Sequence, residues 1–479
     1  MRFKKIFFII PNLKGFYGWP SYPHPGIGYV STYLEAKGVE YDLIDLNIGN
    51  NIQAVKRKIK DFKPELIAVT LYTYKHLHTN KLIARIKENF DIPIVVGGPH
   101  VSLFKSKVMQ ESLIDFAVKH EGEKTLWDIC RGKHLAEISN LIYRDKNNVR
   151  ENPSACFITN LDELPFPRYN RFELDRYKGR EIGIVSSRGC PYSCIYCPVM
   201  TTMGRNFRPR SPQNVVAELV YWHKKGYRNF EFVDDSFLQH NERVNEICDL
   251  IEQEKLSDLT LSCSQGIRAN KVTRGLLTRM YRVGFRCLGF GIESASEKVL
   301  ESIKKGQTFR QIDQAVHAAC EIGYDVRLFF MLGFPGETIA DVEKSFQFAL
   351  KYPVTSANFY NIIPYPGTEL FNRIKENNHF LSIPDVYLNK VITRSQQPVF
   401  KTASMSQAER KQALKNGCQV SRIINRRHRR KQYKKLGAIG QILAWFLTTP
   451  LLYNQIGKIT QYRMGNRLIN TLRRRLTVF

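Results

Sequence analysis

The stretch RGCPYSCIYCPVM, residues 188–200, places three cysteines within eight positions. Cys190, Cys194 and Cys197 follow the pattern CxxxCxxC. A structural zinc site takes four ligands, and the next cysteine along the chain, Cys248, has no companion at ligand spacing. Three thiolates on one loop instead suit a four-iron cluster that leaves one iron open for a ligand from solution. The alternative is a zinc loop that a distant histidine completes.

Apolar segments of strand length alternate with helix-length patterns on both sides of the cysteines. The segment just before them, EIGIVSS, predicts a strand, and Ser211, Pro212 and Gly226 mark the cap, first turn and end of a following helix. Six strand and helix units in order predict an open, partial version of the strand-helix barrel, with active groups at the carboxyl ends of its strands. The predicted strands are 181–187, 229–235, 259–264, 287–293, 325–332 and 358–364.

The first 150 residues have the same alternation of strands and amphipathic helices, which predicts a parallel, doubly wound sheet. Ligands of such sheets bind at the carboxyl ends of the strands. Three loops are expected there: YPHPGIG (22–28), TLYTY (70–74) and GGPH (97–100).

A chain of 479 residues is too long for one core, so several domains are expected. We predict an α/β fold with a doubly wound domain at 1–150, a linker at 151–180, a partial (β/α)6 barrel at 181–385 and a basic, mainly helical region at 386–479. The stretch 140–178 is predicted to form a hairpin and the linker.

CPYSCIYC, placed after the first strand of a partial barrel, resembles the signature of radical S-adenosylmethionine (SAM) enzymes. Further stretches agree with that family: FRPRSPQNVVAEL, FVDDS, GIES, MLGFPGET and PYPGTEL. The resemblance implies that Cys190, Cys194 and Cys197 hold a [4Fe-4S] cluster whose open iron binds SAM. One-electron reduction, by a donor such as flavodoxin or ferredoxin, then cleaves SAM to a 5′-deoxyadenosyl radical.

Candidate SAM contacts lie at the ends of the barrel strands. Asp234 and Asp235 end the second strand and Glu293 ends the fourth, so their carboxylates are expected to point toward the mouth of the barrel. Glycines let the backbone approach a ligand closely, although a strand-to-helix turn explains the glycines equally well. For the carboxylates, the alternative is a helix cap or a loop residue. The predicted SAM residues are Tyr196, which resembles the family's adenine-side position, Asp234, Glu293, Gly333 and Gly336.

A doubly wound domain before such a barrel resembles the cobalamin-binding class of radical SAM enzymes. This class includes methylases of unactivated carbon or phosphorus and the anaerobic cyclase of bacteriochlorophyll synthesis. PHPGIGYVSTYLEAKG and VVGGPHVSLF look like its loops around the corrin, but no Asp-x-His-x-x-Gly occurs, so we do not assign His24 as an axial ligand. The resemblance implies bound cobalamin, with contacts predicted at Gly26, Thr70, Gly97 and Gly98.

The predicted activity is methyl transfer to an unactivated carbon of a small or lipid-like substrate. Radical ring closure or rearrangement without methyl transfer is the first alternative. A tRNA methylthiotransferase is the second, although it would bring another cysteine set in its first domain, where Cys130 and Cys156 stand isolated. The third is a non-catalytic iron-sulfur or zinc protein that docks on membrane or nucleic acid.

Much of the net charge of +28 lies near the carboxyl end. Residues 401–479 hold 18 Lys and Arg and one acidic residue, Glu409. The basic run 426–435 adjoins 22 residues without charge, 436–457, which predicts contact with a membrane surface, while packing on the body or a dimer contact is the alternative. Nucleic acid fits this pattern poorly. Scattered cysteines and a short apolar start predict a cytoplasmic protein. The basic run beside the uncharged segment predicts a peripheral location on the inner face of the membrane.

Overall fold

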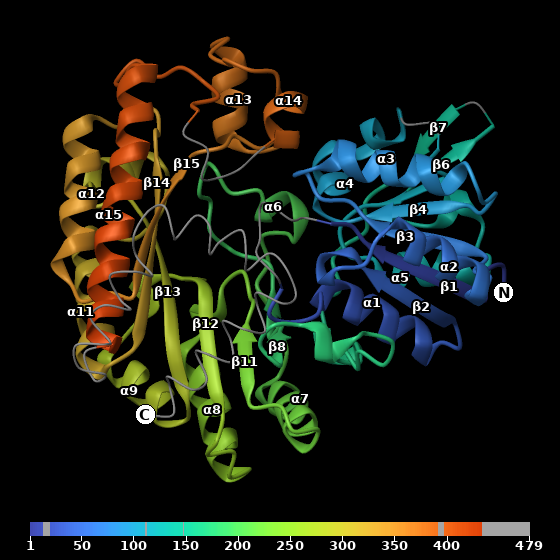
Figure 1. Cartoon of the computed structure of the whole chain (residues 1–479), viewed down its shortest axis with the longest axis horizontal. Coiled ribbons are helices and arrows are strands. Elements are labelled where there is room, and N and C mark those ends of the chain that lie inside the picture. The colour runs from blue at the N-terminus through green and yellow to red at the C-terminus, as the bar shows by residue number, and fades with distance from the viewer. Residues whose placement is uncertain (13–19, 111–112, 147, 391–396, 434–479) are drawn as a thin grey trace.

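The computed structural model describes residues 1–12, 20–110, 113–146, 148–390 and 397–433. Two helix-covered β-sheets lie next to each other, the first drawn in blue and teal and the second in green to orange (Figure 1). The α/β class predicted from the alternation of strands and helices is confirmed.

The first sheet has seven strands in the order β2-β1-β3-β4-β5-β6-β7. Strands β1 to β5 pair in parallel, while β6 and β7 pair antiparallel at one edge. The predicted hairpin is therefore part of this sheet. The strands are β1 (Lys5–Ile10), β2 (Glu40–Asp45), β3 (Leu66–Thr70), β4 (Ile94–Gly97), β5 (Phe116–Val118), β6 (Leu141–Asp145) and β7 (Asn148–Glu151), and the helices are α1 (Pro25–Ala36), α2 (Ile52–Phe62), α3 (His76–Lys87), α4 (Pro99–Phe104) and α5 (Glu123–Arg131).

Strand β1 is apolar because helices bury it on both faces, and its residues from Ile6 to Ile10 are all buried. Its neighbours β2 and β3 lie on opposite sides of it. The chain order therefore reverses between β1 and β3, and a crevice is expected at the carboxyl ends of these two strands.

The second sheet has six parallel strands in the order β15-β14-β13-β12-β11-β8, as the partial barrel requires. A short antiparallel pair, β9 with β10, follows β8. The strands are β8 (Glu181–Ile184), β9 (Ser187–Arg188), β10 (Arg208–Pro209), β11 (Asn229–Phe232), β12 (Thr260–Ile267), β13 (Phe285–Glu293), β14 (Asp325–Leu332) and β15 (Ser356–Asn361). The helices are α6 (Val199–Thr202), α7 (Pro212–Lys224), α8 (Asn241–Gln253), α9 (Arg274–Arg282), α10 (Glu297–Ser302), α11 (Phe309–Ile322), α12 (Ile339–Lys351), α13 (Glu369–Glu376), α14 (Pro384–Lys390) and α15 (Gln407–Tyr433).

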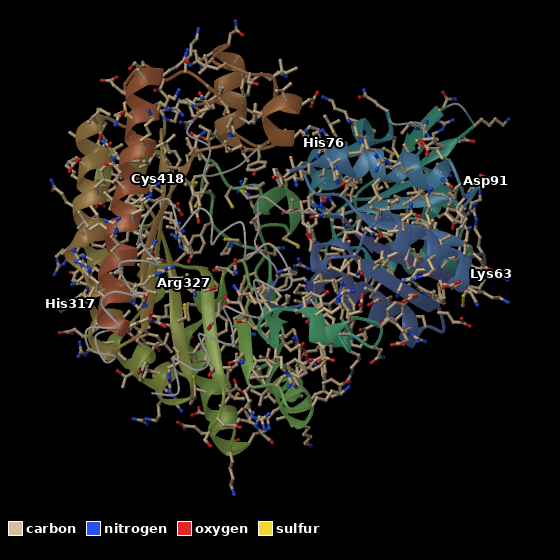
Figure 2. All side chains as sticks on the ribbon, in the orientation of Figure 1. Lys63, His76, Asp91, His317, Arg327 and Cys418 are labelled. Carbon is tan, nitrogen blue, oxygen red and sulfur yellow. The ribbon has the colours of Figure 1, made fainter. Side chains whose placement is uncertain are left out.

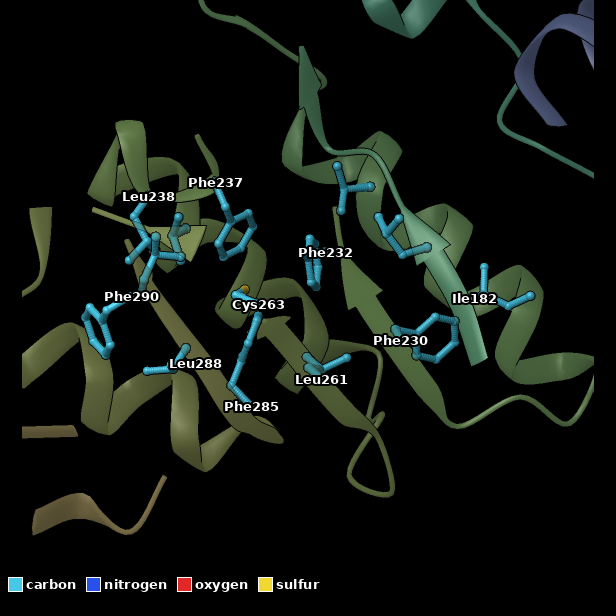
Figure 3. Close-up of a cluster of buried hydrophobic side chains, with 14 of the residues drawn as sticks. Ile182, Phe230, Phe232, Phe237, Leu238, Leu261, Cys263, Phe285, Leu288 and Phe290 are labelled. Atoms are coloured by element: carbon cyan, nitrogen blue, oxygen red, sulfur yellow. The ribbon is translucent and has the colours of Figure 1, made fainter. Parts of the chain in front are cut away.

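Apolar side chains between the second sheet and its helices form the core of the barrel. Phe230 and Phe232 of β11 lie beside Leu261 and Phe285 of the next two strands (Figure 3). The rings of Phe232 and Phe285 stack with centroids 5.5 Å apart. This core supports the strands whose carboxyl ends carry the predicted site.

The first domain and the barrel share packed residues through the linker. Tyr169 is buried, and its ring lies 5.6 Å from that of Trp222 on α7. A Cβ on Gly28 of α1 would lie 2.4 Å from the Tyr169 ring. The glycine at this position of the PHPGIG loop is thus needed for interdomain packing.

The basic carboxyl-terminal region begins as part of the barrel. Helix α15 packs on β15, where a Cβ on Gly417 would lie 2.7 Å from Phe359. Ala413, Leu414 and Ile424 on this helix are buried. The predicted helical character is confirmed for 407–433, while the uncharged segment 436–457 lies outside the described residues. None of the helices in the described part of the chain has the length and apolar character to cross a membrane.

Candidate active site between the two domains

The cysteine loop is held by backbone bonds at several points. Gly189 has a φ of 83°, and a Cβ there would lie 2.3 Å from the backbone oxygen of Asn206. The Cys190 amide donates to the Gly204 carbonyl at 3.2 Å, and the Cys197 amide donates to the Cys194 carbonyl at 3.1 Å. The loop is therefore shaped by the fold before any cofactor binds.

The three thiols are partly or fully buried and influence one another. Burial, with smaller contributions from the neighbouring thiols, raises the pKa of Cys197 to about 12. Burial also raises the pKa of Cys190. Arg268 lies 3.9 Å from the Cys194 sulfur. Thiolates in such surroundings need a cationic partner, which the irons of a cluster supply.

Among the described residues, no three His, Cys, Asp or Glu side chains form a group that could hold a metal ion as they stand. In a four-iron cluster each cysteine bonds a different iron, so its thiols need not converge on one point. The chemistry of the donor set fits a cluster, and the assignment of Cys190, Cys194 and Cys197 as its ligands stays a prediction.

Tyr196 and Glu293, predicted to contact SAM, lie close together. Lys305 donates to Glu293 Oε1 at 2.7 Å and lies 3.4 Å from the Tyr196 hydroxyl. Glu293 sits at an irregularity of β13 with a φ of 67°. A left-handed backbone is uncommon for glutamate and clusters at functional sites. Sequence reasoning missed Lys305, which belongs to none of the motifs.

The adjacent carboxylates Asp234 and Asp235 have different surroundings. Asp234 accepts from the Ser186 amide at 2.6 Å and from the Ser187 hydroxyl at 3.0 Å, so it holds the end of β8. Asp235 accepts from the Gly189 amide at 3.1 Å and faces a cavity. Because protein encloses its other sides, burial raises the pKa of Asp235 to about 6. The predicted contact of Asp234 with SAM stays a prediction, beside this structural role.

The glycines of MLGFPGET have left-handed backbones, with a φ of 99° at Gly333 and 83° at Gly336. The Gly333 amide donates to Glu337 at 2.5 Å. A Cβ on Gly333 would lie 2.6 Å from the guanidinium of Arg410, which α15 contributes. Sequence reasoning missed Arg410, because it treated the basic region as separate from the barrel.

We expect Gly333→Ala to lower the free energy of unfolding by about 2–4 kcal/mol, since it combines an unfavourable φ with overlap against Arg410. The buried guanidinium cannot yield freely, because it donates to the Phe400 carbonyl. A double-mutant cycle with Arg410→Ala, followed by denaturant unfolding, separates the two causes. Additive effects of the two substitutions would contradict the predicted overlap.

A cavity of about 370 Å³ lies between the carboxyl ends of the first sheet and the start of the cysteine loop. Most of its lining from the first domain is apolar, including Phe8, Val69 and Val96. All four predicted cobalamin residues line it: Gly26, Thr70, Gly97 and Gly98. The barrel contributes Val185, Ser187, Arg188, Met203, Val233 and Asp235.

Several features of the first-domain wall fit a bound cofactor. The hydroxyl of Thr70, which lines the cavity, is buried and has no hydrogen-bond partner among the described residues. The same holds for the Thr73 hydroxyl and for Nδ1 of His100, which are not part of the lining. A Cβ on Gly97 would meet one atom within 4 Å, the Val118 oxygen at 3.8 Å, so open space adjoins this glycine. His100 stacks on His76, with centroids 4.6 Å apart. Buried groups of this kind usually mark a missing partner.

His76 lies at the side of the first domain that faces the barrel (Figure 2). The next residue, Leu77, donates its amide to Asn389 of α14 at 3.1 Å. The start of α3 is therefore at an interdomain contact.

His24 uses both ring nitrogens within the first domain. Nδ1 accepts from the Ile27 amide at 3.1 Å at the start of α1, so the Nε2 proton points to the Tyr72 hydroxyl. Burial lowers the pKa of His24 to about 4, which keeps the ring neutral. Because both nitrogens have partners within the protein, the structure gives no reason to assign His24 as an axial ligand.

Comparison with known proteins identifies both domains. Residues 184–349 match the radical SAM superfamily, and residues 20–129 match the B12 binding domain. An uncharacterized methyltransferase of Pyrococcus horikoshii is 32% identical over 400 residues, which cover 80% of this chain and 86% of that protein. The anaerobic magnesium-protoporphyrin IX monomethyl ester cyclase of Rubrivivax gelatinosus is 26% identical and covers 77% and 70%.

The fold is also found in a solved structure. The radical SAM methyltransferase TsrM of Kitasatospora setae, with cobalamin and a [4Fe-4S] cluster bound, aligns with a TM-score of 0.67 at 19% identity, over 78% of this chain and 75% of that one. The matched domains confirm the predicted cofactors, which are a [4Fe-4S] cluster, SAM and cobalamin. The chain therefore belongs to the radical SAM superfamily, among the enzymes that carry an amino-terminal B12-binding domain.

Proposed function

We propose that this enzyme transfers a methyl group to an unactivated carbon of a small or lipid-like substrate. The cavity between the two sheets is the observation that carries the proposal. It has the predicted cobalamin residues on one wall and the segment leading into the cysteine loop on the other. This arrangement favours a reaction that uses both cofactors across one space.

When bound, the cluster with SAM supplies a radical that removes a hydrogen atom, and cobalamin supplies the methyl group. The protein's own residues mainly position these groups and exclude water. Cys190, Cys194 and Cys197 would hold the cluster, and Tyr196 and Glu293 would flank SAM. The apolar lining of the cavity keeps water from the reactive centres.

A lipid-like substrate is supported by two features. The uncharged segment 436–457 adjoins basic residues, a pattern typical of a membrane-surface segment. The relative from Rubrivivax gelatinosus is named for a porphyrin ester, which is a large apolar ring. We therefore propose that the enzyme acts at the cytoplasmic face of the membrane and receives electrons from a small redox protein.

The first test is retention of cobalamin. We expect protein purified without oxygen, and reconstituted with iron, sulfide and hydroxocobalamin, to keep nearly one cobalt per chain after desalting. The visible spectrum and the cobalt content measure this. An intact cluster without retained cobalt would remove the main support for methyl transfer.

The second test follows the methyl group. The reconstituted enzyme is incubated with a reductant and SAM that carries a deuterated methyl group, once with a lipid extract and once with a water-soluble extract. We expect deuterium in a lipid product, detected by mass spectrometry. An unlabelled product with a new ring would instead favour the cyclase function, which the relative from Rubrivivax gelatinosus suggests as the second candidate.

A further inference from the structure

Four charged side chains meet in the interface between the two domains. Glu121 and Glu123 come from the first domain, after β5 and at the start of α5. Arg188 on β9 donates to Glu121 at 2.9 Å and to Glu123 at 2.7 Å. Arg208 on β10 donates to Glu121 at 2.7 Å. We call these four residues the interdomain ion cluster.

The ion cluster is buried and balanced in charge. The exposed fractions of its side chains are 9% or less. Burial alone would raise the pKa of Glu121, but Arg188 and Arg208 hold it below its ordinary value. Burying ions carries a desolvation cost that their attraction barely offsets, so such a group adds little net stability. A role in fixing geometry explains it better.

The ion cluster joins the cavity to the cysteine loop. Glu121, Glu123 and Arg188 line the cavity. Arg188 lies two residues before Cys190 and stacks over the Tyr29 ring at 4.8 Å. Because β9 pairs with β10, both arginines belong to the two strands that frame the loop. A shift of the first domain would therefore move the loop through these ion pairs.

We propose that the interdomain ion cluster positions the cysteine loop relative to the cobalamin cavity, so that methyl transfer from SAM to cobalamin depends on it while reductive cleavage of SAM does not. The inference rests on the proposed function. In the transfer, the bond between the methyl carbon and sulfur breaks, its electron pair stays on sulfur to give S-adenosylhomocysteine, and the methyl group passes to cobalamin. The electron pair that forms the new bond to the methyl carbon comes from cobalamin, which titanium(III) citrate has reduced. In the cleavage, one electron breaks the bond between adenosyl C5′ and sulfur, leaving methionine, and the adenosyl fragment becomes 5′-deoxyadenosine by taking a hydrogen atom from solvent components.

The test compares two products in one reaction. Full-length protein with cluster and cobalamin is mixed with SAM and titanium(III) citrate, and S-adenosylhomocysteine and 5′-deoxyadenosine are measured by chromatography. We expect Glu123→Gln to lower the first product about tenfold to a hundredfold, as small misplacements of reacting groups do, and to leave the second within about twofold.

Glu151→Gln is the matched control. Glu151 pairs with Lys119 at 2.9 Å, and both residues lie within the first domain. The substitution removes the same charge from a partly buried pair but crosses no interface. We expect the ratio of the two products to stay at the parent value.

Hydrogen exchange on the cluster-free protein gives a readout that does not depend on activity. We expect Glu123→Gln to speed exchange of amides in residues 187–210, while Glu151→Gln leaves these amides unchanged. An unchanged product ratio, or an equal fall of both products, would overturn the positioning role. Parent protein that binds cobalamin and yields deoxyadenosine but no S-adenosylhomocysteine would overturn the proposed function, and the positioning role with it.

Discussion

Cys194→Ala is expected to reduce iron and sulfide loading and the formation of 5′-deoxyadenosine to background. The cysteine is buried within the loop, next to Arg268. Loss of one of three thiolates leaves a second iron without a protein ligand, so a stable cluster cannot form. Without the cluster no electron reaches SAM. The measurements are iron and sulfide content after anaerobic reconstitution, and deoxyadenosine by chromatography.

Cys320→Ala is the matched control, because Cys320 is a half-buried cysteine on α11, away from the loop. This variant should load iron and cleave SAM like the parent. Thermal unfolding of both variants shows whether either substitution harms the fold. Deoxyadenosine formation that persists in Cys194→Ala would contradict the cluster assignment.

Gly189→Ala is expected to have the second largest effect. The φ of 83° is unfavourable for alanine, and the new Cβ would overlap the backbone oxygen of Asn206 at 2.3 Å. Two more carbonyls, of Met203 and Gly204, lie at 3.2 Å, so the backbone has no room to yield. We expect the free energy of unfolding to fall by about 2–5 kcal/mol, and iron loading to fall with it.

Gly226→Ala separates strain from overlap. Gly226 has a φ of 84°, but its nearest neighbour is the Arg180 guanidinium at 4.0 Å. This variant should lose about 1–2 kcal/mol and load iron normally. Denaturant unfolding and iron analysis of both variants test the prediction. Equal losses in the two variants would mean that the crowding around Gly189 has no energetic effect.

The order of the elements was predictable from the sequence because each strand and helix has its own local pattern. The segment EIGIVSS, whose first four residues form β8, is mostly apolar. The helix after it begins as predicted at Pro212, with the Ser211 hydroxyl accepting from the Asn214 amide at 3.1 Å. Such signals depend on neighbouring residues and need no tertiary information. The six barrel strands appear in the expected order for the same reason.

The partners of the site residues were not predictable in the same way. Lys305 pairs with Glu293 from 12 positions away, and Arg410 reaches Gly333 from a helix in the basic region that was predicted to lie outside the barrel. Glu121 and Arg188 meet across two domains. Single charged residues carry no pattern that says which other charge they will meet.

The sequence by itself carried the motifs that resemble the family, the three closely spaced cysteines and the strand-helix order, because motifs and periodicity are properties of the chain alone. Only the tertiary structure decided which groups face one another. It brought the loops of the first domain opposite the cysteine loop, formed the cavity between them and buried four charges between the domains. These contacts join residues far apart in the chain, and their geometry depends on how two complete sheets pack together.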